Sequence, residues 1–294
     1  MADKIKRKFP SWLRKVVPAT STDRTINILA SQRIHTICES ARCPNKSECF
    51  SQKKATFLIL GNICTRSCAF CSVRQGVPLP VDSTEARRIA HGAFQLGLKH
   101  VVITSVTRDD LRDGGANHFA LTVQALEDRL PDASVEVLTP DFEGFSASLD
   151  IVCKSGIDIF NHNLETARRL YPTVRPEGDY ERSLSVLQYV RDAYPHVLIK
   201  SGIMVGLGEN DHEVVEVLDD LHEVGCDIVT IGQYLQPCMR KRNVERFVIP
   251  QLFSTYADYA KKIGIRFISS GPFVRSSYNA EAVYEAVQTG GSVL

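Results

Sequence analysis

Short apolar segments alternate with helical segments along most of the 294 residues, and this alternation restricts the fold more than any other feature. Six segments rich in aliphatic and β-branched residues are predicted strands: 56–61, 100–106, 134–139, 157–163, 197–205 and 227–234. Segments with helical spacing lie between and after them: 83–96, 115–130, 146–155, 180–193, 211–224 and 251–263. Strands separated by helices of about 10–15 residues form βαβ units and a parallel sheet.

Six units are fewer than the eight of a complete TIM barrel. We therefore predict an α/β fold, a partial (β/α)6 TIM-like barrel with N- and C-terminal extensions. Residues 1–54 read as polar and irregular apart from a short helix near 26–31. The barrel is expected over 55–265, and a C-terminal extension over 266–294, beginning with a short strand. The same alternation is also compatible with a doubly wound sheet.

Polar residues follow several of the predicted strands, which are otherwise apolar, as expected when both faces are buried. Thr107, Asn163, Glu165 and Gln233 lie at or just after strand C-terminal ends. In a barrel these ends form the active-site face. Ser83 is the expected N-cap of the helix at 83–96.

Six of the nine cysteines fall between Cys38 and Cys71. The sequence contains no apolar run long enough to span a membrane and no secretory signal, so we expect a cytoplasmic protein. In that reducing compartment clustered cysteines are expected to be ligands or catalysts rather than disulfides. Cys153, Cys226 and Cys238 are isolated, and for Cys153 and Cys226 we expect buried, inert thiols.

The formal net charge of +1 gives no sign of a nucleic-acid or membrane partner. The basic residues are concentrated at the start of the chain. This stretch is either a solvated arm or a dock for an acidic protein. Its basic residues are Lys4, Lys6, Arg7, Lys8, Arg14 and Lys15.

The clustered cysteines form two triads. Cys64, Cys68 and Cys71 follow the first predicted strand with the spacing C-x3-C-x2-C, and Cys38, Cys43 and Cys49 precede it with the spacing C-x4-C-x5-C. Structural zinc sites are closed by four ligands, and the spacings of four and five residues in the upstream triad are unusual for zinc. Three thiolates are one fewer than usually close a 4Fe–4S cube, which leaves one iron able to bind another group.

The C-x3-C-x2-C spacing, with Phe70 before its last cysteine, resembles the radical S-adenosylmethionine (SAM) superfamily. The resemblance implies that Cys64, Cys68 and Cys71 hold a 4Fe–4S cluster whose free iron binds the amino and carboxylate groups of SAM. One electron then cleaves the sulfonium, and a 5′-deoxyadenosyl radical abstracts a hydrogen atom from an unactivated carbon. The protein supplies positioning and exclusion of water.

The second triad, together with four further segments, resembles lipoyl synthases over residues 25–280. The segments are 39–45 (ESARCPN), 160–166 (FNHNLET), 200–209 (KSGIMVGLGE) and 271–278 (GPFVRSSY). The resemblance implies insertion of two sulfur atoms at C6 and C8 of a protein-bound octanoyl chain. It also implies an auxiliary 4Fe–4S cluster on Cys38, Cys43 and Cys49, with Ser277 as the fourth ligand and Ser276 as the alternative.

The same resemblance implies the SAM contacts and the partners. Asn163 and Glu165 are expected at the ribose hydroxyls, and Thr107 and Arg175 at the methionine end, although Arg175 has a surface ion pair as its alternative. Partners would be octanoylated lipoyl carrier domains, namely the E2 subunits of 2-oxoacid dehydrogenases and the glycine cleavage H protein, and a ferredoxin- or flavodoxin-type electron donor. The glycine-rich segment is expected beside the adenine ring, with Gly202, Met204 and Gly206.

Two other functions stay open at this point. A biotin-synthase-like sulfur-inserting enzyme would explain the C-x3-C-x2-C motif but neither the upstream triad nor the paired serines. A non-catalytic zinc-binding interaction module would explain the clustered cysteines and the basic start. It would leave the polar residues at the strand ends unexplained.

Overall fold

A parallel sheet forms the centre of the molecule. The structure is a computed structural model that describes residues 9–15 and 20–289. The main sheet has the strand order β1-β2-β5-β6-β7-β8-β9-β10. Each neighbouring pair is parallel except β1 and β2, which are antiparallel. The strands are β1 (His35–Thr36), β2 (Thr56–Ile59), β5 (His100–Ser105), β6 (Ser134–Leu138), β7 (Ile159–Asn161), β8 (Leu198–Val205), β9 (Ile228–Gln233) and β10 (Phe267–Gly271).

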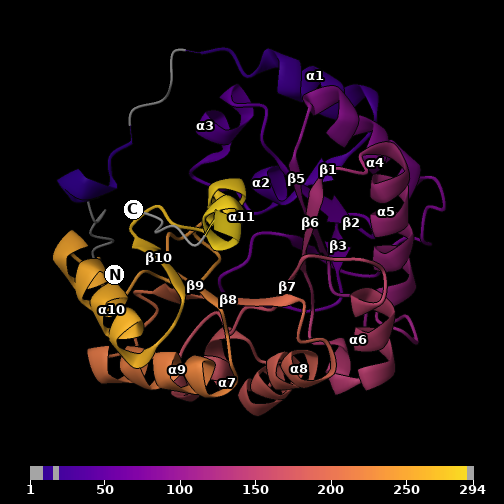
Figure 1. The fold of residues 1–294 in the computed structure, drawn as a ribbon. Helices are drawn as coiled ribbons and strands as arrows, with labels where there is room; N and C mark the ends of the chain where they lie inside the picture. The colour runs from indigo at the N-terminus through magenta and orange to yellow at the C-terminus, as the bar shows by residue number, and fades with distance from the viewer. Residues whose placement is uncertain (1–8, 16–19, 290–294) are drawn as a thin grey trace.

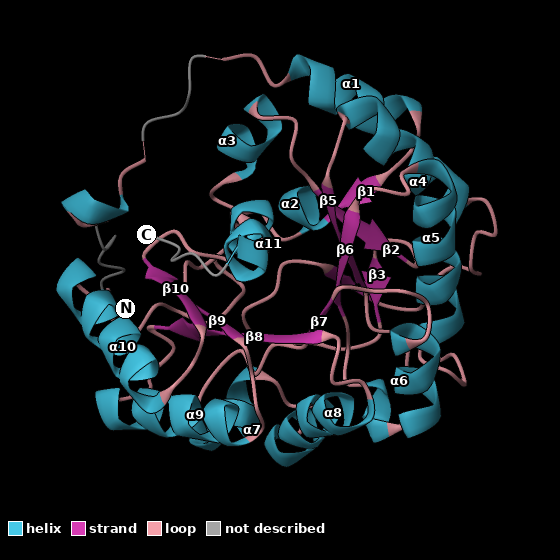
Figure 2. Ribbon diagram, in the orientation of Figure 1, coloured by secondary structure: helices cyan, strands magenta, loops and turns pink. Residues whose placement is uncertain are grey.

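Helices cover the outer face of this curved sheet (Figure 1). The long helices are α1 (Asp23–Ser31), α4 (Glu85–Leu96), α5 (Ala116–Arg129), α6 (Ser146–Cys153), α8 (Tyr180–Ala193), α9 (Asp211–Glu223), α10 (Pro250–Ile263) and α11 (Ala280–Thr289). Short helical turns are η1 (Ser11–Leu13), α2 (Ile37–Ser40), α3 (Lys46–Ser51), η2 (Phe142–Gly144), η3 (Arg168–Leu170) and α7 (Tyr171–Val174). The strands stand inside the ring of helices (Figure 2), so the predicted partial barrel is confirmed.

Local sequence explains where several helices begin. The side chain of Asn210 accepts a hydrogen bond from the main-chain N–H of Glu213, and the Glu213 side chain accepts one from the N–H of Asn210. This capping box fixes the start of α9. Helix α10 begins with Pro250, whose missing N–H costs nothing in a first turn. The predicted N-cap of α4 was wrong. The helix begins at Glu85, and Asp82 accepts the N–H of Thr84 instead.

Both extensions add to the same sheet. Strand β1, from the N-terminal extension, pairs with β2, and β10, from the C-terminal extension, pairs with β9. The short strand predicted at the start of the C-terminal extension is therefore confirmed as β10, whereas β1 was not predicted, and with the six barrel strands they make the eight strands of the main sheet. The short helix predicted near 26–31 is confirmed by α1, but the rest of this extension is less irregular than expected, because α2 and α3 are helical. Most of the basic start, residues 1–8, lies outside the described residues.

Helix α11 packs against the N-terminal ends of the strands. Val283 belongs to a buried hydrophobic cluster with Ile159, Ile228 and Phe267, each the first residue of its strand. The hydroxyl of Tyr284 donates to a carboxylate oxygen of Asp158 at 2.8 Å. One end of the barrel is therefore covered, and the opposite end carries the loops described below. No helix in residues 9–15 and 20–289 is long and apolar enough to cross a membrane.

Candidate active site

A cavity of about 460 Å³ lies at the C-terminal ends of the strands. All six cysteines of the two triads line it. So do seven of the predicted site residues: Thr107, Asn163, Glu165, Arg175, Gly202, Met204 and Ser277. Gly206, which follows β8, does not line it. Residues from the two extensions and from five strand ends thus meet in one place.

The downstream triad lies on the loop that follows β2. Cys64 ends the two-residue strand β3 (Ile63–Cys64), which pairs with β4 (Arg74–Gln75). The main-chain N–H of Ala69 donates to the oxygen of Val174 at 2.8 Å, and that of Thr65 donates to the oxygen of Thr107 at 3.1 Å. The loop is therefore tied to helix α7 and to the segment that follows β5.

The upstream triad lies on two short helical turns. Cys38 is in α2, whose N-cap Thr36 accepts the N–H of Glu39, and Cys49 is in α3. Cys43 lies between them, and its N–H donates to the oxygen of Cys38 at 3.0 Å. A chain of local hydrogen bonds therefore turns all three thiols to the same cavity.

Burial dominates the chemistry of these thiols. It raises the pKa of Cys38 and Cys68 to about 12 and that of Cys49 and Cys71 to about 11. Repulsion from the other thiols of the same triad adds to the rise for Cys38 and Cys68. Without a cation these groups stay protonated, and a bound metal would deprotonate them.

The donor set fits iron–sulfur clusters. All nine cysteines are free, and thiolate sulfur is the usual protein ligand of 4Fe–4S clusters. Among the described residues, no three His, Cys, Asp or Glu side chains are close enough to hold a single metal ion. Cys153 and Cys226 are buried away from the cavity, as predicted.

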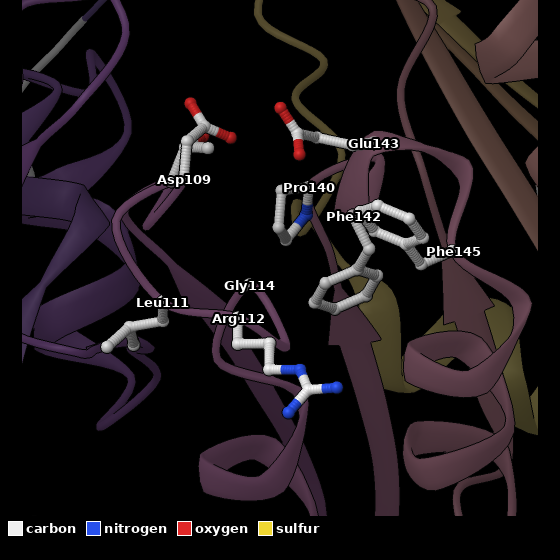
Figure 3. Close-up of a pocket in the computed structure, with 9 residues that line it drawn as sticks. Asp109, Leu111, Arg112, Gly114, Pro140, Phe142, Glu143 and Phe145 are labelled. Carbon is white, nitrogen blue, oxygen red and sulfur yellow. The ribbon is translucent and has the colours of Figure 1, made fainter.

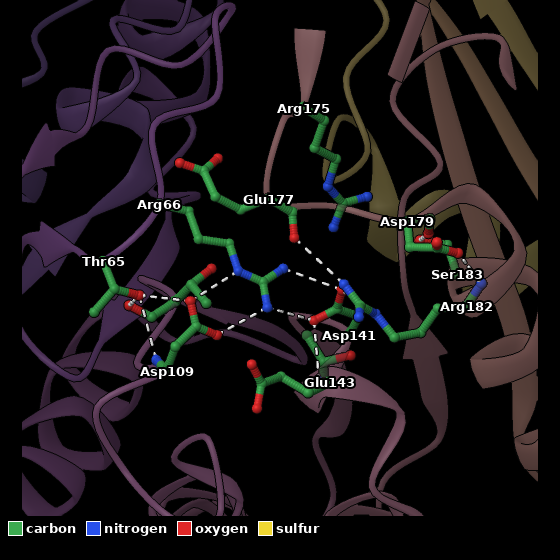
Figure 4. A network of polar contacts seen from close by, with 12 residues as sticks. Thr65, Arg66, Asp109, Asp141, Glu143, Arg175, Glu177, Asp179, Arg182 and Ser183 are labelled. Carbon is green, nitrogen blue, oxygen red and sulfur yellow. Dashed lines mark hydrogen bonds and ion pairs between the residues drawn. The ribbon is translucent and has the colours of Figure 1, made fainter. Parts of the chain in front are cut away.

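A buried arginine anchors the downstream loop. Arg66 lies between Cys64 and Cys68 in the chain, and its guanidinium donates to Asp109 at 2.8–2.9 Å and to Asp141 at 2.8–3.1 Å. Asp141 also accepts from Arg182 at 2.9 Å (Figure 4). This group was not predicted from the sequence. Asp109 and Asp141 follow strands β5 and β6, so the strand-end rule that selected Thr107 would have found them.

Asn163, Glu165 and Arg175 form a second polar group across the cavity. The amide nitrogen of Asn163 donates to a carboxylate oxygen of Glu165 at 3.1 Å, and Arg175 donates to the main-chain oxygen of Asn163 at 2.9 Å. Glu165 has a φ of 69° and pairs with β8 through its own N–H and C=O. Burial raises the pKa of its carboxyl.

Arg175 is not a surface residue, so that alternative is wrong. Its side chain is buried and stacks toward the ring of Tyr171, with 5.8 Å to the ring centre. Within the described residues it makes no hydrogen bond or ion pair to a carboxylate. A buried guanidinium beside Cys68 can bind an incoming anion such as a carboxylate.

Gln233 is a structural residue. Its amide nitrogen donates to the main-chain oxygens of Val205, Tyr234 and Arg246, and its amide oxygen accepts the N–H of Val248 at 2.8 Å. All of its hydrogen-bonding capacity is used within the fold. It does not line the cavity.

A second, much smaller pocket lies beside the Arg66 group (Figure 3). It has a volume of about 10 Å³ and is bordered by Asp109, Arg112, Pro140 and Phe142. A space of this size holds one water molecule at most. It is not a site for a cofactor.

Comparisons with known proteins point to the same family as the cysteine triads. The sequence profile of the radical SAM superfamily matches residues 58–221. A lipoyl synthase from Caldanaerobacter subterraneus subsp. tengcongensis is 49% identical over 272 residues, which cover 92% of this chain and 95% of that protein. One from Oleidesulfovibrio alaskensis is 51% identical over 274 residues, which cover 93% and 94%.

Solved structures share the fold at low sequence identity. Methylornithine synthase is 17% identical with a TM-score of 0.54 and covers 84% of this chain and 74% of its own. Streptococcus suis SuiB bound to S-adenosylmethionine is 13% identical with a TM-score of 0.59, covering 72% of this chain and 49% of its own. With cysteine triads, barrel and near-full-length relatives in agreement, this chain belongs to the lipoyl synthase family of the radical SAM superfamily.

Proposed function

We propose that this protein inserts two sulfur atoms, at C6 and C8, into an octanoyl chain attached to a lipoyl carrier protein. When bound, SAM on one 4Fe–4S cluster supplies the radical that abstracts each hydrogen atom, and a second 4Fe–4S cluster supplies the sulfur. The observation that carries the proposal is that two cysteine triads from different parts of the chain line one cavity.

The residues divide into two sets of ligands. Cys64, Cys68 and Cys71 would hold the SAM-binding cluster. The auxiliary cluster would be held by Cys38, Cys43 and Cys49 with the hydroxyl of Ser277. Membership of the radical SAM superfamily supports the first set directly, and the second rests on the upstream triad and Ser277 facing the same cavity.

The remaining residues would hold SAM. Arg175, a buried cation, suits the methionine carboxylate, with Thr107 beside it. Asn163 and Glu165 offer a donor and an acceptor for the ribose hydroxyls. Gly202 and Met204 line the cavity beyond them, on the side proposed for adenine. Gly206 does not line the cavity, so it would contribute only by setting the course of the main chain directly after β8.

The proposed protein partners follow the family. The octanoylated substrate would be an E2 subunit of a 2-oxoacid dehydrogenase or the glycine cleavage H protein. The electron donor would be of the ferredoxin or flavodoxin type. The test is to incubate the reconstituted protein with an octanoylated carrier domain, SAM and a strong reductant, and to measure the carrier mass. A gain of two sulfur atoms is expected.

A matched pair of variants separates the two triads. Cys68→Ala should abolish formation of 5′-deoxyadenosine, because two thiolates do not hold a cube. Cys43→Ala should still form 5′-deoxyadenosine but add no sulfur to the carrier. Iron content should fall from about eight to about four per chain in each variant.

Two outcomes would contradict these assignments. Normal 5′-deoxyadenosine formation by a folded Cys68→Ala variant would remove that triad from the SAM site. Lipoyl product from Cys43→Ala would make the upstream triad structural, and the proposed sulfur source would be wrong.

A further inference from the structure

The segment after β10 turns back into the barrel and lies against the inward faces of β8 and β9. A β-carbon on Gly232 would overlap the main-chain oxygen of Val274 and would lie 3.0 Å from a guanidinium nitrogen of Arg275. Only glycine permits so close an approach. The main chain is therefore fixed in position just before Ser276.

Ser276 closes a hydrogen-bonded chain across the cavity. Its hydroxyl donates to the amide oxygen of Asn163 at 2.9 Å, and the amide nitrogen of Asn163 donates to Glu165 at 3.1 Å. A carboxylate accepts and does not donate. The amide of Asn163 therefore has one orientation that satisfies both partners, with its nitrogen toward Glu165 and its oxygen toward Ser276.

Gly202 supplies an independent sign that this contact is built into the fold. A β-carbon at Gly202 would overlap the hydroxyl of Thr230, and it would lie 3.0 Å from the amide oxygen of Asn163 and 3.1 Å from the hydroxyl of Ser276. The space beside β8 that a side chain would fill is thus taken by the Ser276–Asn163 hydrogen bond.

The two neighbouring serines differ in their partners. Both line the cavity. Ser276 is engaged with Asn163, whereas the hydroxyl of Ser277 makes no hydrogen bond within the described residues. Only Ser277 has its oxygen lone pairs and proton uncommitted. This difference favours Ser277 over Ser276 as the ligand of the auxiliary cluster.

We infer that Ser276 is a positioning residue for SAM: it holds the amide of Asn163 in the orientation in which Asn163 and Glu165 together bind the ribose. The inference rests on the proposed function, which puts the ribose at this pair, and adds a role for the C-terminal extension in that site. Without the Ser276 hydroxyl, the buried amide oxygen of Asn163 loses its donor and the amide is free to turn.

The test is the dissociation constant of SAM, measured by anaerobic equilibrium dialysis on the reconstituted protein. Ser276→Ala should weaken binding about three- to tenfold, the effect of one hydrogen bond to a buried group. Ser276→Thr keeps the hydroxyl and should restore most of the affinity. Ser270→Ala is the matched control, because the Ser270 hydroxyl donates to the oxygen of Phe253 at 2.8 Å, outside the site; its affinity should equal that of the parent.

Two further measurements separate positioning from ligation. In Ser276→Ala the iron and sulfide contents should match the parent, and KM for SAM should rise more than kcat falls. Loss of about four iron atoms per chain would make Ser276 a cluster ligand and overturn the inference. Unchanged affinity in Ser276→Ala, or equal weakening in Ser276→Thr, would also overturn it.

SAM binding by the parent protein shows whether the inference or the proposed function has failed. If the parent binds SAM and the Ser276 variants bind it with the same affinity, the inference fails and the proposed function stands. If the parent binds no SAM, the proposed function fails, and the inference falls with it.

Discussion

Arg66 carries a positive charge into the loop that bears the downstream triad, and its surroundings determine how firmly that loop is held. Its side chain is 5% exposed, and its two carboxylate partners differ, since Asp141 is 0% and Asp109 30% exposed. Burial alone would raise the pKa of Asp141, but Arg66 and Arg182 hold it well below its ordinary value. Asp141 therefore stays ionised and is the principal anchor.

Substituting each carboxylate tests this difference. Asp141→Asn should lower the free energy of unfolding by about 3 kcal/mol, because it leaves buried charge without its partner. Asp109→Asn should lower the free energy of unfolding by at most about 1 kcal/mol, the usual contribution of a partly exposed ion pair. Urea unfolding of both variants measures the effect. Formation of 5′-deoxyadenosine should fall only in Asp141→Asn, and equal losses in the two variants would contradict the ranking.

At the scale of elements, the strands and long helices were predictable because their periodicity is local. Each strand from β2 to β9 in the main sheet lies within a predicted range, and α8 matches its predicted bounds. Helices α2 and α3 were not predicted, because they have four and six residues and depend on capping and tertiary contacts. The polar layer inside the barrel was missed as well. Its residues are isolated within apolar strands.

That polar layer joins three strands. The ammonium group of Lys200, on β8, donates to both carboxylate oxygens of Glu136, on β6, at 2.8–2.9 Å. The amide of Asn161, on β7, donates to the same carboxylate at 2.9 Å. The two charged side chains are 1% and 0% exposed. Burial alone would raise the pKa of Glu136, but Lys200 and His100 lower it to about 2.

Glu136→Gln should lower the free energy of unfolding by about 3–5 kcal/mol at pH 7, because Lys200 is left buried without a counter-charge. Glu216→Gln, which changes an exposed contact between Glu216 and His212 on α9, should lower the free energy of unfolding by less than about 1 kcal/mol. Adding Lys200→Met to Glu136→Gln should recover much of the loss. Urea unfolding of the cluster-free protein measures all three, and a Glu136→Gln cost as small as the control would contradict the expectation.

The same pair predicts a pH dependence. The pKa of Glu136 in the folded protein, about 2, is below its ordinary value of about 4.3. The contribution of ionised Glu136 to the free energy of unfolding is therefore fully present above about pH 5 and is lost as the pH falls toward 2. In Glu136→Gln, unfolding free energies measured over this window should decline less steeply than in the parent. An identical decline would show that other carboxylates carry the effect.

At the scale of the whole molecule, the N- and C-terminal extensions meet beside the upstream triad. The amide of Asn45 donates to the oxygen of Phe273 at 2.7 Å, and the hydroxyl of Tyr278 donates to Glu48 at 3.0 Å. Lys15, predicted as part of a basic arm, pairs with Glu48 and donates to Asn45. The partners in the Asn45–Phe273 and Tyr278–Glu48 contacts are more than 200 residues apart in the chain. No local pattern in the sequence therefore predicts these contacts.

This closure brings Ser277, from the C-terminal extension, to the cavity lined by the three upstream thiols. A hydroxyl oxygen is a weaker ligand for iron than a thiolate, and four thiolates are the usual set of electron-transfer clusters that keep their sulfide. An oxygen at the fourth position therefore suits the proposed role of this cluster, which is to give up sulfur. A fourth thiolate would hold it closed.

Ser277→Cys should accordingly retain about eight iron atoms per chain and form 5′-deoxyadenosine, yet yield little lipoyl product. Ser277→Ala should lose auxiliary-cluster iron more readily while SAM cleavage survives, since Cys64, Cys68 and Cys71 are untouched. Iron, 5′-deoxyadenosine and lipoyl product are measured for both, with Ser270→Ala as the control for serine truncation in the same extension. If both variants equal the parent in all three quantities, Ser277 is not the ligand. The thiolate variant is the more telling of the two, because a merely structural serine replaced by cysteine would lose neither cluster nor product.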